Sequence, residues 1–250
     1  MELTVYLIVC PLVFLAGLVD SIAGGGGLIS LPAYFLAGIP PHLSIGTNKL
    51  SSSIGTAIST FRFCRNKSVD WGLAVPSIVL ALTGSALGAQ LALLVDEDVM
   101  KKILLVILPI VAFYIFRNKN LNSDVVMTPL PRKKLFVIIS LVSFAVATYD
   151  GFYGPGTGTF LLLLYTGLGK MDIRIASGNT KLVNLSSNIA ALVTFLINGK
   201  ILLPLGLTAA LFSIAGHFIG SGLVLKNGYK IVKPIILVVL VLLFISLVKP

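Results

Sequence analysis

Gly46-Thr47-Asn48-Lys49-Leu50 is a motif that occurs twice, since the chain returns to it 132 residues later as Gly178-Asn179-Thr180-Lys181-Leu182. We therefore interpret the chain as one duplicated unit, with residues 1–119 as the first repeat, 120–133 as a linker and 134–250 as the second repeat. Further residues match at the same offset, or at an offset of 130 ahead of the motif: Phe63 with Phe195, Gly84 with Gly216, Gly88 with Gly220, Asp20 with Asp150, Gly24 with Gly154 and Gly26 with Gly156.

The composition places both repeats in a membrane. Of the 250 residues, 56% are hydrophobic and 11% are charged, and the mean hydropathy is +1.01. Soluble domains are about 45–50% apolar and about 25% charged, so this chain has too few charges to cover a water-exposed surface. A soluble enzyme, a nucleic-acid-binding module and a disordered protein are excluded, even though the net charge is +10. The expected fold class is an all-α polytopic membrane protein.

Each repeat contains five apolar segments. A helix needs about 20 apolar residues to cross a bilayer, and segments 26–39 and 157–169 are shorter and glycine-rich, so full spans and half-helices are both open for them. Because five is an odd number, the second repeat is expected to enter the membrane upside down, which gives two inverted repeats. The segments are about 3–20, 26–39, 46–64, 70–95 and 99–117, then 134–150, 157–169, 177–197, 201–225 and 231–249.

The distribution of lysine and arginine agrees with this topology. With the N-terminus outside, thirteen basic residues fall in inside loops and four in outside loops, as the positive-inside rule expects. The stretch 117–134 is then cytoplasmic. The inside residues are Arg62, Arg65, Lys67, Arg117, Lys119, Arg132, Lys133, Lys134, Lys170, Arg174, Lys226, Lys230 and Lys233, and the outside residues are Lys101, Lys102, Lys200 and Lys249.

Lys49 and Lys181 are the leading candidates for a functional role. They occupy the same place in the two repeats, beside long uncharged stretches. A charge at the centre of a bilayer costs about 2.5–3.5 kcal/mol on insertion scales, so such a residue faces a cavity or a partner. One interpretation is that the two lysines attract an anionic substrate. The other is that they form structural ion pairs with Asp20 and Asp150, which are also candidates for coupling transport to a second ion.

Neutral polar groups and glycines near the lysines complete the predicted substrate site. Hydroxyl and amide side chains follow each lysine at helical spacing, and bare glycine backbone and helix N-termini can bind an anion. Contacts between helices are the alternative role for the same residues. Besides the lysines, the predicted substrate-binding residues are Thr47, Asn48, Ser52, Asn179, Thr180, Asn184, Asn188, Gly25, Gly26 and Gly156.

Other motifs indicate structure rather than chemistry. Gly84-x-x-x-Gly88 and Gly216-x-x-x-Gly220 are typical of helix-packing faces. His42 and His217 have no histidine or cysteine at metal-ligand spacing, and His217 is expected to be a packed neutral imidazole. The sequence predicts no metal site and no cofactor, and an enzyme is not expected.

The glycine and lysine motifs together resemble those of the TauE/SafE family of sulfite exporters and sulfonate-uptake permeases. The resemblance implies transport of sulfite, a sulfonate or a related organosulfur anion through a prokaryotic cytoplasmic membrane. The second copy departs from the first, with Pro155 in the place of a glycine and Thr180 in the place of Asn48. The resembling stretches are GLVDSIAGGGG at 17–27, Leu31-Pro32, Gly46–Lys49 and Gly178–Lys181.

The sequence therefore predicts a secondary transporter for a small sulfur oxyanion, such as sulfite or sulfoacetate, bound near the midplane between the repeats. No ATP-binding motif is visible, so the energy would come from H⁺, another coupling ion or the substrate gradient itself. The alternatives are an anion channel lined by the same residues and a non-transporting membrane scaffold. The expected partners are the anion and the lipid bilayer, without nucleic acid. The identity of the anion, the direction of transport and a homo-oligomer stay open.

Overall fold

The structure, a computed structural model, describes residues 2–96, 98–99, 130–227, 231 and 234–235. These residues form eight α-helices and no β-strand, which confirms the all-α prediction. The expected segments 99–117 and 231–249 and most of the linker lie outside the described residues. In chain order the helices are α1 (Leu3–Ala23), α2 (Gly27–Leu36), α3 (Pro41–Arg65), α4 (Trp71–Leu94), α6 (Arg132–Phe152), α7 (Thr157–Gly167), α8 (Ile173–Ile197) and α9 (Leu203–Asn227).

The helices fall into three kinds by length and polarity. Five of them, α1, α4, α6, α8 and α9, are long and apolar enough to cross a membrane. Helix α3 has 25 residues like α8, but it is more polar and neighbouring helices bury most of it. Helices α2 and α7 have 10 and 11 residues, and at 1.5 Å per residue they cover about 15 Å, half of a bilayer core. They are half-helices, which decides between the two alternatives for segments 26–39 and 157–169.

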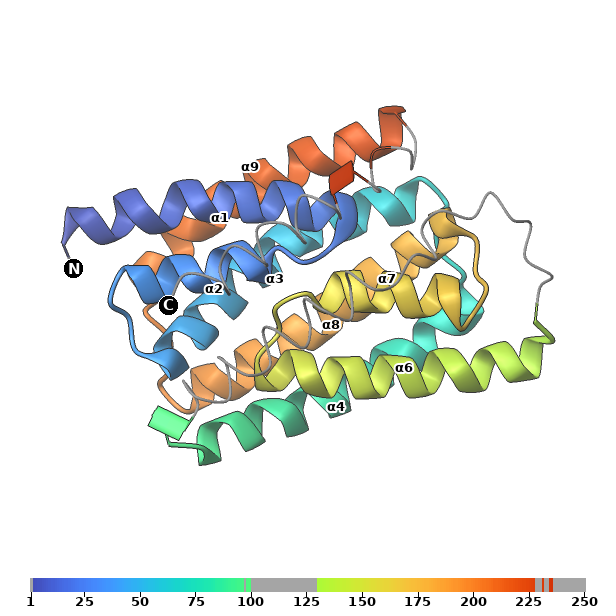
Figure 1. Cartoon of the computed structure of the whole chain (residues 1–250), viewed down its shortest axis with the longest axis horizontal. Helices are drawn as coiled ribbons and strands as arrows, with labels where there is room; N and C mark the ends of the chain where they lie inside the picture. The colour runs from blue at the N-terminus through green and yellow to red at the C-terminus, as the bar shows by residue number, and fades with distance from the viewer. Residues whose placement is uncertain (1, 97, 100–129, 228–230, 232–233, 236–250) are drawn as a thin grey trace.

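The helices pack as two outer pairs around a central pair (Figure 1). Helix α1 packs against α9 and α4 against α6, while α3 and α8 contact each other between these pairs. Helix α3 also contacts α9, and α8 contacts α4. The half-helix α2 lies against α1 and α3, and α7 lies against α6 and α8. Exchanging α1, α2, α3 and α4 for α6, α7, α8 and α9 leaves this pattern of main contacts unchanged.

The bundle is apolar outside and polar inside. Large apolar side chains such as Leu7, Leu141 and Leu211 are exposed, whereas the hydroxyl, amide and ammonium groups of α3 and α8 are mostly buried. An apolar exterior suits contact with lipid, and polar groups at that depth must be satisfied by protein or by water in a cavity. The chain is therefore a multi-pass membrane protein whose polar centre is built from α3 and α8.

Paired glycines bring the outer helices together. A Cβ atom at Gly84 of α4 would lie 2.7 Å from the carbonyl oxygen of Phe144 on α6. At Gly216 of α9, the counterpart position, it would collide with the carbonyl oxygen of Phe14 on α1. Because the backbones approach this closely, the prediction that the two GxxxG motifs are helix-packing faces is confirmed.

Gly46 and Gly178, the first residues of the two motif copies, allow close backbone contacts of the central helices α3 and α8. A Cβ atom at Gly46 would collide with the carbonyl oxygen of Lys200, and one at Gly178 would collide with the carbonyl oxygen of Ser68. Lys200 and Ser68 belong to the loops that precede α9 and α4. Each central helix is thereby held against a loop of the other repeat.

The residue after each of these glycines bonds to the same loop. The Thr47 hydroxyl oxygen accepts a hydrogen bond from the backbone N–H of Leu202 at 3.0 Å. In the other repeat, the Asn179 side-chain oxygen accepts one from the backbone N–H of Asp70, also at 3.0 Å. Leu202 and Asp70 directly precede α9 and α4, so both side chains secure the start of a long outer helix.

Replacing Gly178 by Ala tests this packing. The added methyl group would meet a backbone carbonyl that cannot move without the α3–α4 loop, and overpacking of this kind costs about 1–3 kcal/mol. We expect a lower midpoint of thermal unfolding for the purified protein in detergent. The control is Gly222→Ala, where the new Cβ atom meets only the end of the Arg62 side chain, at 3.2 Å. Equal midpoints for the two variants would contradict the close approach.

Candidate functional site

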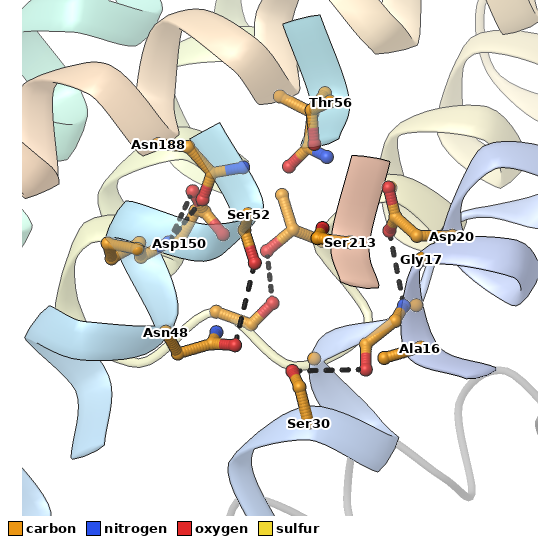
Figure 2. Close-up of a pocket in the computed structure, with 18 of the residues that line it drawn as sticks. Ala16, Gly17, Asp20, Ser30, Asn48, Ser52, Thr56, Asp150, Asn188 and Ser213 are labelled. Atoms are coloured by element: carbon orange, nitrogen blue, oxygen red, sulfur yellow. Dashed lines mark hydrogen bonds and ion pairs between the residues drawn. The ribbon is translucent and has the colours of Figure 1, made fainter. Parts of the chain in front are cut away.

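A small cavity lies at the centre of the bundle, bordered by both half-helices and by α1, α3, α6, α8 and α9 (Figure 2). Its water-accessible volume is about 30 Å³, enough for about two water molecules. Asp20 and Asp150 lie on opposite sides of it, with Ser52 and Ser213 between them. Eight of the predicted substrate-binding residues line the cavity, namely Gly25, Gly26, Asn48, Lys49, Ser52, Gly156, Asn184 and Asn188.

Lys49 forms a buried ion pair with the second repeat. Its Nζ atom lies 2.8 Å from Asp150 Oδ2, and both side chains are almost fully buried. The ammonium group also donates to Asn188 Oδ1 at 3.0 Å, and the Ser187 hydroxyl donates to Asp150 Oδ2 at 2.6 Å. Breaking a buried pair by removing one partner leaves an uncompensated charge, so this contact holds α3 to α6 and α8.

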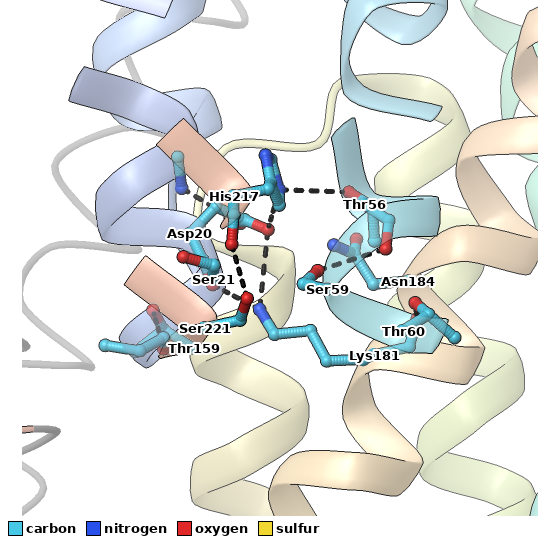
Figure 3. Close-up of polar contacts among 12 residues, drawn as sticks. Asp20, Ser21, Thr56, Ser59, Thr60, Thr159, Lys181, Asn184, His217 and Ser221 are labelled. Carbon is cyan, nitrogen blue, oxygen red and sulfur yellow. Dashed lines mark hydrogen bonds and ion pairs between the residues drawn. The ribbon is translucent and has the colours of Figure 1, made fainter. Parts of the chain in front are cut away.

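Lys181 forms the counterpart pair with the first repeat. Its Nζ atom lies 3.5 Å from Asp20 Oδ2 and also donates to the backbone carbonyl of Asp20. The Asp20 carboxylate accepts the backbone N–H of Gly26 at 3.1 Å, and His217 Nε2 lies 3.3 Å from its Oδ2 atom (Figure 3). Each lysine therefore pairs with the aspartate of the opposite repeat. The ion-pair interpretation holds for both lysines, and their contact with substrate stays a prediction.

Both half-helices point their N-termini at the cavity. Gly26 precedes α2 and Gly156 precedes α7, and both line the cavity. The backbone of Gly156 is left-handed, with φ of +83°, which glycine adopts without strain. A Cβ atom at Gly24 would collide with the backbone of Gly158, so the glycine-rich loop before α2 touches the first turn of α7. Helix N-termini carry partial positive charge and N–H donors, which favour an anion.

Four predicted substrate-binding residues do not line the cavity. Thr47 and Asn179 bond to the loops before α9 and α4, as described above. The Thr180 hydroxyl is buried without a hydrogen-bond partner among the described residues. Lys181 lies behind Asp20 rather than at the cavity wall. The cavity is therefore asymmetric, because it exposes one lysine of the pair.

His217 is a cavity residue that the sequence did not indicate. It is buried, as expected, but its imidazole lines the cavity and contacts Asp20. One difference between the two halves of the sequence could have drawn attention to it, because the position 132 residues earlier holds Ser85 and not a histidine. Among the described residues, no cluster of three or more His, Cys, Asp or Glu side chains could hold a metal ion.

The family model described as "Sulfite exporter TauE/SafE" matches residues 9–247. The chain belongs to the TauE/SafE family. This confirms the resemblance carried by the glycine and lysine motifs.

Curated relatives of this TauE/SafE chain are named as transporters. It is 37% identical to "Probable membrane transporter protein ORF9" of Sinorhizobium sp, over 94% of this chain and 88% of the relative. It is 34% identical to "Probable membrane transporter protein YfcA" of Escherichia coli (strain K12), over 90% and 82%. It is 33% identical to a "Probable membrane transporter protein" of Haemophilus influenzae, over 90% and 87%. No solved structure matches the chain.

The Lys49–Asp150 pair can be tested by charge removal. Lys49→Gln leaves the Asp150 carboxylate buried without a cation, which typically costs about 3–5 kcal/mol, so we expect a large loss of thermal stability in detergent. The double variant Lys49→Gln/Asp150→Asn carries neither charge and should regain most of that loss. Lys133→Gln, at an exposed lysine in the first turn of α6, is the control and should stay near the wild type. A double variant no more stable than the single one would refute the pairing.

Proposed function

We propose that this chain is a secondary transporter that carries a small sulfur oxyanion, such as sulfite or a sulfonate, through the cavity between its repeats. Its relatives are named membrane transporters rather than enzymes or scaffolds, and the family model is described as a sulfite exporter. The observation that carries the anion proposal is the cavity itself, where one ammonium group and the N-termini of two half-helices converge.

The ion pairs explain why the buried charges of such a site are stable when no substrate is bound. Without substrate, Asp150 neutralises Lys49 at 2.8 Å, so no buried charge is left without a partner. An entering anion competes with the Asp150 carboxylate for the same ammonium group. This competition keeps the affinity moderate, and a transporter needs a moderate affinity because it must release its substrate on the other side.

Neutral donors would complete the coordination of the anion. The amides of Asn48, Asn184 and Asn188 and the hydroxyl of Ser52 line the same cavity. A pyramidal or tetrahedral oxyanion presents several oxygens, each of which accepts hydrogen bonds, so a ring of amide and hydroxyl groups suits it. An alternating-access transporter would open this cavity to each side of the membrane in turn.

We further propose that the repeats are inverted in an inner membrane, with the N-terminus outside. Figure 1 supports this, since α1 and α6 run in opposite directions along the bundle. The loop between α3 and α4 lies at the same end as the starts of α6 and α8. At that end Arg174 donates to the backbone oxygen of Asn66 at 2.8 Å. Arg132 donates to Asp70, also at 2.8 Å, and its guanidinium group holds the pKa of that carboxyl below its usual value.

Transport is tested with purified protein in liposomes. A panel of sulfite, sulfoacetate, taurine, thiosulfate and sulfate should include at least one anion that the wild type takes up in a saturable way, with counterflow. We expect the neutral variant Lys49→Gln/Asp150→Asn to lose this uptake, and Lys133→Gln to keep it. Undiminished uptake by the neutral variant would remove the ion pair from the mechanism, and flux without counterflow would indicate a channel.

The inverted topology is tested by labelling single cysteines. Cys10 and Cys64 are first replaced by Ser, and then Lys67→Cys and Asn198→Cys are made separately, because both of these positions are exposed at helix ends. A membrane-impermeant maleimide applied to intact cells should label the cysteine at 198, and should reach the one at 67 only after permeabilisation. Labelling of both from the same side would contradict the inversion.

A further inference from the structure

One hydrogen bond determines which nitrogen of His217 can exchange a proton. The Nδ1 atom lies 2.9 Å from the backbone carbonyl oxygen of Ser213, four residues earlier in α9. A carbonyl oxygen can only accept, so this contact favours a hydrogen on Nδ1, and the Ser213 hydroxyl oxygen, 3.3 Å from the same nitrogen, can accept as well. The Nε2 atom is therefore the position at which the imidazole gains or loses its proton.

The Nε2 atom faces an acceptor and a group that can donate (Figure 3). Asp20 Oδ2 lies 3.3 Å away, and the hydroxyl oxygen of Thr56 lies 3.4 Å away. When a proton lies between Nε2 and Asp20 Oδ2, the two atoms form a hydrogen bond, whether the proton is bound to the nitrogen or to the oxygen. Without it, two lone pairs would face each other, and the Thr56 hydroxyl can then donate to Nε2 instead. Both protonation states thus have a hydrogen-bond partner in place.

The charged groups around this contact allow the proton to leave. Asp20 also pairs with Lys181 of α8 at 3.5 Å and accepts the Gly26 N–H at 3.1 Å. After deprotonation, the carboxylate therefore keeps a cation and a backbone donor. On α3, which packs against α9, Lys49 lines the same cavity and pairs with Asp150. The guanidinium group of Arg62, also on α3, contacts α9 four residues beyond His217, where it donates to the Ser221 hydroxyl at 3.2 Å.

Glycines on two neighbouring helices make room for the imidazole. A Cβ atom at Gly17 of α1 would lie 2.8 Å from His217 Nδ1, and one at Gly55 of α3 would lie 2.6 Å from it. In the other half of the bundle, Ser85 stands in place of His217 and Ser187 in place of Gly55. There Ser187 donates its hydroxyl hydrogen to Asp150. The two aspartates thus differ, because Asp20 alone of the pair has a titratable imidazole beside it among the described residues.

We propose that His217 and Asp20 form a proton-binding site and that the coupled ion is H⁺, which moves in the same direction as the anion. This inference rests on the proposed function and assigns its source of energy. Asp20 and His217 line the same cavity as Lys49, so a proton bound there adds positive charge beside the anion, and the anion in turn favours the proton. Release of either one weakens the binding of the other, which couples the two movements.

The experiment uses the full chain in liposomes that contain a pH-sensitive dye, with the sulfur anion that the transport panel identifies. For the wild type we expect anion influx to acidify the lumen, and an inward proton gradient to drive accumulation of the anion. His217→Gln should lose gradient-driven accumulation and anion-induced acidification, while anion counterflow continues and no longer depends on pH. His42→Gln is the matched control, because His42 lies outside the cavity and bonds to the backbone of Ala92.

The possible results separate this inference from the proposed function. If the wild type moves no anion of the panel under any gradient, the proposed function fails. If it moves an anion but the lumen does not acidify and the pH gradient drives no accumulation, proton coupling is overturned and the transport function stands. The wild-type dye signal needs no variant, so a poorly folding His217→Gln protein would not weaken the test. If His217→Gln folds and keeps full gradient-driven accumulation, His217 does not hold the coupled proton.

Discussion

Two lysines buried in an apolar bundle must each have a negative partner, and most of the architecture follows from this requirement. Lys49 of the first repeat pairs with Asp150 of the second, and Lys181 pairs with Asp20. Because each pair joins the two repeats, neither half satisfies its own buried charge. The central helices α3 and α8 must therefore lie together, with the apolar helices outside them, and the two half-helices begin where the charges meet.

Glycine is the residue that allows this arrangement. Gly46 and Gly178 let the central helices touch loop backbone of the opposite repeat, and the GxxxG glycines bring the outer helices together. The close contacts recur in both halves at counterpart positions. The same kind of close backbone contact therefore stabilises both halves of the bundle.

The contacts are duplicated, but the chemistry of the two halves differs. Lys49 faces the cavity, whereas Lys181 lies behind Asp20. Asp150 receives a serine hydroxyl, while Asp20 lies beside an imidazole. A transporter that moves an anion together with a second ion needs two unlike sites close to each other. The two halves thus differ at a few positions, while the main helix contacts are the same in both.

The residues alone were enough to predict a helical membrane protein and its family, and to single out Lys49 and Lys181 as buried charges, because hydropathy, motifs and charge are properties of the chain itself. Which aspartate each lysine meets could not be read from the chain, since the partners lie more than 100 residues apart and meet only when the repeats pack. The same reason explains why Thr47 and Asn179 proved to secure loops. It also explains why His217, a lone histidine beside a packing glycine, proved to face the cavity.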